Sequence, residues 1–191
     1  MALSLALGPR LKRKPGPRSV SLRWLIPRAL ATGLLLVPTV AAAGVPTLRI
    51  RAISGATAQE VDRIRQGILL ANKVMASTCF REEVLRTDFT ENRGLSSAEI
   101  YAKLSAQPIS LNVDLYMGDD RANFIYRTQG YEREPGTVHV NRFFIKQPRQ
   151  FASLFMHEGE GHSQGFRHHY MKRTSVPYGM NRIFRTCVDR L

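Results

Sequence analysis

The sequence of 191 residues is poor in cysteine, in acidic residues and in long apolar runs. Its 15 Asp and Glu stand against 28 Lys and Arg, a formal net charge of +13, which by itself points to nucleic acid or an anionic membrane surface. The apolar run at 29–43 contains Pro38 and has 15 residues, fewer than the ~20 that span a bilayer. A hydrophobic fraction of 43% excludes a wholly disordered chain.

Much of the positive charge lies in residues 1–43, which hold seven basic residues and no acidic one. The basic segment precedes the apolar run and three small residues, Ala41–Ala43, an order typical of a secretory leader. We therefore predict a signal peptide over residues 1–43, cleaved after Ala43, and a secreted or periplasmic domain over residues 44–191. A retained membrane anchor is the less favoured alternative, and we expect no stable membrane span after cleavage.

Without this leader the chain keeps 21 basic and 15 acidic residues, a net charge of +6. Its basic residues are scattered and form no long run, as on an ordinary solvated surface. We therefore expect no nucleic-acid partner, and we expect a monomer.

The two cysteines, Cys79 and Cys187, both lie in the predicted exported part. In an oxidising compartment a single pair most simply forms a disulfide, which would tie the C-terminal end to the first third of the domain. Zinc ligation by this pair is less favoured, because the two do not form a close Cys-x-x-Cys motif.

Periodicity and capping signals predict an α+β fold in one domain, with a small mixed or antiparallel sheet packed on helices. Apolar residues alternate, or cluster in short runs, in the predicted strands at 48–53, 80–89, 109–116, 124–127 and 137–145. Capping-box spacing predicts helices that begin near 57 and 96, and Pro148 suits the first turn of a third helix. We expect a last short helix near 181–189. The helix that begins near Pro148 should run into a cluster of histidines.

Four of the five histidines lie between positions 157 and 169, in the segment MHEGEGHSQGFRHH. A hydrolytic zinc site needs three imidazoles on one ion, an open position for water, and a carboxylate that takes the proton of that water. Surface histidines in a polar loop are the alternative, and the apolar helical approach at 151–155 makes it less favoured.

At these residues the sequence resembles the zincin metallopeptidases, and within them the metzincin clan. Residues 162–168 fit the clan's His-x-x-Gly-x-x-His, SVPYGM at 175–180 looks like its Met-containing turn, and residues 136–141 resemble the strand bordering its cleft. The resemblance covers about 136–185. It implies a zincin-like domain in which an active-site helix carries the metal motif, with a peptide or protein as substrate.

The spacing departs from the clan's His-Glu-x-x-His, because His157 and His162 are five residues apart. On an α-helix, four steps leave two side chains roughly 40° apart, and five leave them roughly 140° apart. A π-bulge eased by Gly159 and Gly161 would absorb the extra residue, and the dipeptidyl-peptidase III family, with its His-Glu-x-x-x-His, is similar. There are two alternatives. The helix could be regular, with Glu158 as the first ligand, or the protein could be a catalytically inactive descendant of the clan. We favour the bulge.

With the bulge, the resemblance implies that Zn2+ is held by His157, His162 and His168, with His169 as an alternative to His168. Glu158 would be the general base. Tyr178 would stabilise the oxyanion, although a packing role is at least as strongly expected for it.

Three functions follow as hypotheses. The favoured one is an exported zinc-dependent metallopeptidase that hydrolyses peptide bonds. A catalytically inactive, zincin-fold metal-binding protein of the envelope or medium is the alternative, and a basic envelope-binding module is the third.

Overall fold

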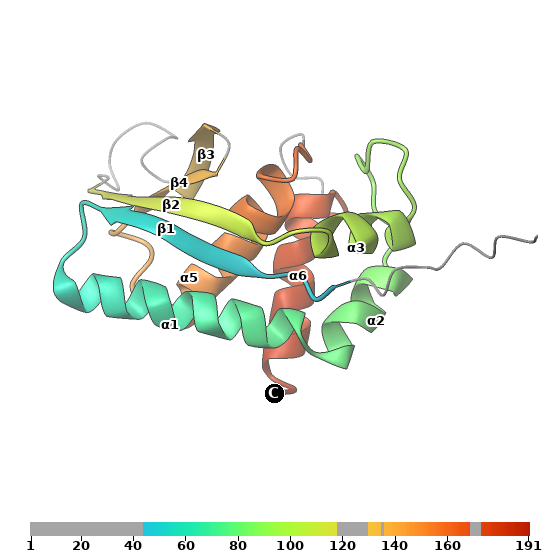
Figure 1. Ribbon diagram of the computed structural model, residues 1–191, viewed down its shortest axis with the longest axis horizontal. Helices are drawn as coiled ribbons and strands as arrows, with labels where there is room; N and C mark the ends of the chain where they lie inside the picture. The colour runs from blue at the N-terminus through green and yellow to red at the C-terminus, as the bar shows by residue number, and fades with distance from the viewer. Residues whose placement is uncertain (1–43, 118–129, 135, 169–172) are drawn as a thin grey trace, which may run out of the picture. The chain divides into compact units, whose positions relative to one another are not determined.

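The computed structural model describes residues 44–117, 130–134, 136–168 and 173–191 (Figure 1). Within these residues a four-stranded sheet has the order β1-β2-β4-β3. Three strands are parallel, β1 (Leu48–Ser54), β2 (Ile109–Tyr116) and β4 (Thr137–Asn141), and β3 (Gly130–Glu134) is antiparallel to β4. The mixed α+β prediction is confirmed, with a sheet that is mainly parallel rather than antiparallel.

The helices of the described residues form two groups in the chain, three between β1 and β2 and three after β4. They are α1 (Ala58–Met75), α2 (Thr78–Arg86), α3 (Ser97–Ser105), α5 (Pro148–Phe155), the π-helix η1 (Met156–His162) and α6 (Val176–Val188). Figure 1 shows α1 running below the sheet, nearly along β1. Helix α1 also packs against α5, and η1 packs against α6.

One face of the sheet is buried against the helices. Along β2, Ile109, Leu111, Val113 and Leu115 are buried, and the residues between them are half-buried. This strict alternation is what a strand with one covered face requires. The predicted strands at 48–53 and 109–116 are thereby confirmed.

Both predicted capping boxes are present. Thr57 and Glu60 cap α1, and Ser96 and Glu99 cap α3, with side chain and backbone bonded reciprocally in each pair. Each box satisfies backbone N–H groups that the first turn of a helix leaves without a partner.

Two predicted strands differ from the structure, and two further predictions are not tested by it. The predicted strand at 80–89 is helix α2, because Ser77 caps it and Phe80 and Val84, one helical turn apart, are both buried. Strand β4 ends at Asn141, before the predicted end at Ile145. The predicted strand at 124–127 and the predicted signal peptide lie outside the described residues.

The last helix begins earlier than predicted. Helix α6 starts at Val176, with Pro177 in its first turn, a position that proline tolerates because no N–H is needed there. The segment 175–180 is therefore the cap and first turn of a helix, and the prediction of a Met-containing turn is wrong. Met180 is fully buried within α6.

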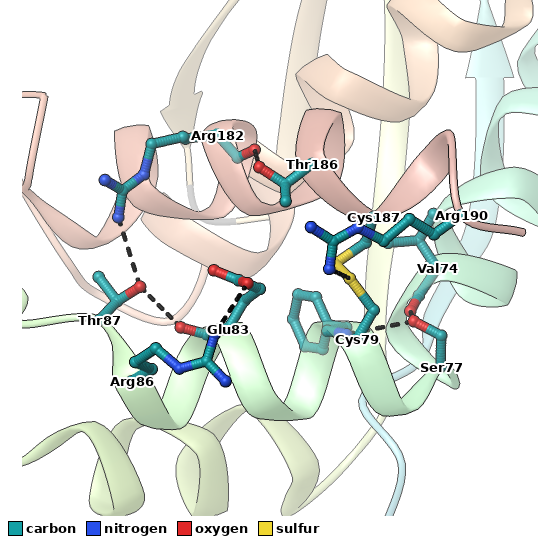
Figure 2. Close-up of a disulfide and its surroundings, with 11 residues drawn as sticks. Val74, Ser77, Cys79, Glu83, Arg86, Thr87, Arg182, Thr186, Cys187 and Arg190 are labelled. Carbon is teal, nitrogen blue, oxygen red and sulfur yellow. Dashed lines mark hydrogen bonds and ion pairs between the residues drawn. A yellow bond between two sulfur atoms is a disulfide. The ribbon is translucent and has the colours of Figure 1, made fainter.

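The predicted disulfide is confirmed: Cys79 on α2 and Cys187 on α6 are joined, with an S–S distance of 2.01 Å (Figure 2). Nearby, Arg182 Nη2 of α6 donates a hydrogen bond to Thr87 Oγ1 at the end of α2, at 3.3 Å. The two helices are thus held together by a covalent bond and a polar contact. In the described part of the chain, no helix is both long and apolar enough to cross a membrane.

Strand β1 stands at one end of the strand order and is irregular. Its pairing with β2 shifts register between Ile50 and Ala52, so Arg51 is the extra residue of a β-bulge. Arg49 and Arg51 are both exposed.

Candidate metal site

The histidine motif lies on a π-helix that continues α5 without a break. Backbone N–H groups here donate hydrogen bonds to the carbonyl five residues earlier, as Ser163 N does to the carbonyl of Glu158 at 2.9 Å. Residues five apart therefore follow one another on the same side, as residues four apart do in an α-helix. The predicted bulge is confirmed, and it brings His157 and His162 to one side of η1.

Two glycines allow η1 to lie between the sheet and α6. A Cβ at Gly159 would lie 3.0 Å from Leu48 Cδ2 and 3.1 Å from Leu111 Cδ1, on the inner face of the sheet. A Cβ at Gly161 would lie only 2.7 Å from Pro177 Cα and Cβ. The helix can approach both neighbours this closely only because these positions have no side chain.

The chain then reverses and returns a third histidine to the other two. Gly165 has φ +81°, in the left-handed region that favours glycine, and its N–H donates to the carbonyl of His162 at 2.7 Å. The segment after this turn places His168 beside η1. The alternative third ligand, His169, lies outside the described residues.

His157, His162 and His168 form the group that is close enough to hold one metal ion, with their ligand atoms within 4.8 Å of one another. His157 Nε2 and His168 Nε2 are 3.2 Å apart. The three ring centroids are 4.8 to 5.2 Å apart. Among the described residues this group does not include Glu158, so the alternative with Glu158 as a ligand is not the arrangement that forms.

Backbone carbonyls orient two of these rings. His162 Nδ1 lies 2.9 Å from the carbonyl of Phe166, and because a carbonyl only accepts, the proton sits on Nδ1 and Nε2 keeps its lone pair. His157 hydrogen-bonds to the backbone of Pro177. Such backbone partners are typical of histidines that bind metals through the other nitrogen.

His157 is neutral at neutral pH. Burial, together with the proximity of His162 and His168, lowers its pKa to about 3, although the hydrogen bond to Pro177 acts in the opposite direction. A neutral imidazole is the state that coordinates a metal. The site therefore needs no deprotonation of His157 before an ion enters.

Tyr178 lies against two of the histidines from the first turn of α6. Its ring centroid is 4.8 Å from that of His157 and 4.4 Å from that of His168. The side chain is half-buried. Helix α6, rather than a turn, therefore places Tyr178 beside the histidines.

Two carboxylates of η1 differ in their surroundings. Glu158 is 4% exposed, and its Oε2 lies 4.0 Å from His162 Nε2. Glu160 is fully buried, and neither of its carboxylate oxygens has a hydrogen-bond partner among the described residues. Burial raises the pKa of Glu160 to about 8.

Sequence reasoning missed the burial of Glu160, although its signal was present. Phe155 is fully buried, and in a π-helix the residue five positions later follows it on the same side. It also missed the contact of Arg93 with the turn between His162 and His168, in which Arg93 Nη1 donates to the carbonyl of Gly165. Nothing in the local sequence marks that contact, because it joins segments 72 residues apart.

Compared with known proteins, the chain matches no protein-family model, no curated protein and no solved structure.

Proposed function

We propose that the protein is an exported zinc-dependent metallopeptidase with a zincin-like domain. The observation that carries the proposal is the convergence of His157, His162 and His168 around one point, with the Glu158 carboxylate beside it. The disulfide between α2 and α6 supports export, since such bonds persist in oxidising compartments.

The donor set suits zinc, and one pair of its nitrogens has the spacing that zinc requires. Two nitrogen ligands at ~2.05 Å from a tetrahedral zinc ion lie about 3.3 Å apart, and His157 Nε2 and His168 Nε2 are 3.2 Å apart. Three protein ligands leave the fourth position open, which is the arrangement of catalytic rather than structural zinc sites. Zinc held there would supply Lewis acidity, lowering the pKa of a water molecule and polarising a carbonyl group.

Glu158 is the general base of this proposal. It takes a proton from the attacking water as the new C–O bond forms, and it then delivers that proton to the amine nitrogen, which leaves as the peptide C–N bond breaks. Its low exposure strengthens its interaction with charges in the site, because water screens them poorly there. Tyr178, whose ring lies against those of His157 and His168, would donate a hydrogen bond from its hydroxyl group to the developing oxyanion.

An extended peptide substrate would lie along β3. This strand ends the strand order among the described strands, and it packs against η1. An edge strand offers backbone N–H and C=O groups to which another extended chain can pair. A peptide bound there would pass beside the metal site.

Zinc content tests the metal site. The purified exported protein should contain about one zinc per chain by elemental analysis, and His162→Ala should lose it. His139→Ala is the matched control, because His139 lies on β4 outside the three-histidine group. A folded wild-type protein that takes up no zinc would contradict the proposal.

Peptide cleavage tests the general base. With a quenched fluorescent peptide library, Glu158→Gln should reduce kcat/KM by about 10² to 10⁴-fold while zinc content stays unchanged. Glu82→Gln, an exposed change on α2, is the control. Activity that is indifferent to Glu158→Gln would remove the proposed base.

Metal binding without hydrolysis is the second candidate function. It is favoured by the fact that the Glu158 carboxylate is 4% exposed, which restricts access of a substrate to it. One zinc per chain with no cleavage in a broad peptide library would support this function over the first.

A further inference from the structure

The loop between α2 and α3 is hydrogen-bonded to the segment just before α6, next to the metal site. Thr90 N donates to the carbonyl of Thr174 at 2.9 Å, and Thr90 also forms a β-bridge with Ser175. In the view of Figure 1, this loop and β3 lie at the upper edge, on either side of η1.

The loop carries two residues in a backbone conformation that their side chains disfavour. Glu91 and Arg93 have φ of 53° and 59°, in the left-handed region. Asn92 lies between them and Gly94 follows, and these residue types adopt that region more readily. Strain of this kind clusters at binding and catalytic sites, where a particular side chain is required.

The guanidinium of Arg93 rests on the turn that joins two of the histidines. Its Nη1 donates to the carbonyl of Gly165 at 3.4 Å, and a Cβ at Gly165 would lie 3.1 Å from the same atom. A guanidinium has five N–H donors, and this contact uses one of them. Arg93 is exposed, so its charge is accessible to a molecule at this end of the site.

The separation along the chain limits how far Arg93 can lie from the metal site. Gly165 is three residues from His162 and three from His168, and three residues span at most about 10 Å even when fully extended. A bound peptide advances about 3.3 Å per residue. A group held by Arg93 would therefore belong to a residue within about three positions of the bond that lies at the metal.

We propose that Arg93 is a specificity-determining residue that binds a substrate carboxylate within about three residues of the scissile bond. The carboxylate is an acidic side chain or the C-terminus of a short peptide, and a guanidinium binds either with charge-assisted, bidentate geometry. This inference rests on the proposed peptidase function of the same site.

Binding to a protein that cannot turn over its ligand is the test. The zinc-loaded Glu158→Gln protein is titrated with labelled peptides that carry Glu, Gln or Lys at each position in turn, with free or amidated C-termini. We expect the best Glu peptide, or the free C-terminus over the amide, to bind about tenfold more tightly than its neutral match. A difference between Glu and Gln peptides would identify the carboxylate as an acidic side chain. A difference between free and amidated peptides would identify it as the C-terminus.

Variants of Arg93 separate recognition from a structural role. Added to the Glu158→Gln background, Arg93→Gln should remove the preference, and Arg93→Glu should reverse it in favour of the Lys peptide. Arg49→Gln, an exposed change on β1, is the matched control. A merely structural arginine would lower the affinity for all peptides alike and would not reverse their order.

Several outcomes would overturn the proposal. They are equal binding of acidic and neutral peptides, a preference that survives Arg93→Gln, and no peptide binding at all. Failure of the peptidase function is distinguishable, because it appears as absent cleavage by the wild-type protein while the carboxylate preference and its reversal remain.

Discussion

Breaking the disulfide between Cys79 and Cys187 should lower the free energy of unfolding by about 4 kcal/mol. The two cysteines are separated by 108 residues, so in the unfolded chain the bond closes a loop that includes most of the domain. A cross-link of this kind acts mainly by restricting the unfolded ensemble, and the chain-entropy model gives about 4.7 kcal/mol for a loop of 100 residues. Residual structure in the unfolded chain reduces this value somewhat.

The effect is large compared with the whole stability of a domain, which is about 5 to 15 kcal/mol. With a urea dependence of about 2 kcal/mol per molar, a loss of 4 kcal/mol lowers the midpoint of unfolding by about 2 M. Because the Cys187 side chain is fully buried, a Cys187→Ala substitution also removes packing. The reduced wild-type protein is therefore the cleaner comparison.

Urea unfolding followed by circular dichroism is the assay. It compares the oxidised protein, the same protein in a reductant, and the Cys79→Ala, Cys187→Ala double variant with and without reductant. The reduced protein should unfold about 2 M below the oxidised one. Reductant should leave the double variant unchanged, which controls for effects of the reductant itself.

Two results would refute the reasoning. Mass spectrometry that finds two free thiols in protein purified from an oxidising compartment would contradict the pairing. Equal midpoints for protein with a verified disulfide and protein with a verified dithiol would contradict the entropic argument.

Three further predictions concern η1 and the start of α1. Gly161→Ala should cost about 1 to 3 kcal/mol and weaken zinc binding, because its Cβ would lie 2.7 Å from Pro177; urea unfolding and zinc content measure both. Glu160→Met should raise stability at pH 7 by roughly 1 to 3 kcal/mol, since it removes a buried carboxyl without a partner. That gain should grow as the pH rises from 4.5 towards 8, because a raised folded-state pKa makes wild-type stability fall across this range; a loss of stability would contradict it. Thr57→Ala should lower the free energy of unfolding by about 1 kcal/mol. Hydrogen bonding to Thr57 also lowers the pKa of Glu60, so the stabilisation that Glu60 contributes is present above pH 4.5 and is lost as the pH falls below it. Acid titrations of the Glu60→Gln variant, which should lack this dependence, check the last point.

Local signals predicted the elements that local physics determines. The alternation along 109–116 and the capping boxes at 57–60 and 96–99 identify β2, α1 and α3, because these patterns depend on near neighbours. The π-helix followed from chemistry rather than propensity. Only a bulge brings two histidines five residues apart to one side of a helix.

Elements whose structure depends on distant contacts were not predicted. Phe80 and Val84 fit a strand as well as a helix in a short segment, and the helix forms with both side chains in the core. The resemblance of residues 175–180 to a Met-containing turn gave a turn where a helix begins, although Pro177 also suits the first turn of a helix. The parallel pairing of β1, β2 and β4 joins segments far apart in the chain, and no local pattern encodes it.

The two ends of the sheet differ in how well they can accept another strand. At β1 the bulge at Arg51 interrupts the regular spacing of backbone donors and acceptors, and two exposed arginines on the same strand repel a second copy of it. At the far end, β3 lies beside η1 and carries no such arginine pair. Among the described strands, β3 is therefore the end that accepts a further extended chain more readily, and pairing through the β1 edge is disfavoured.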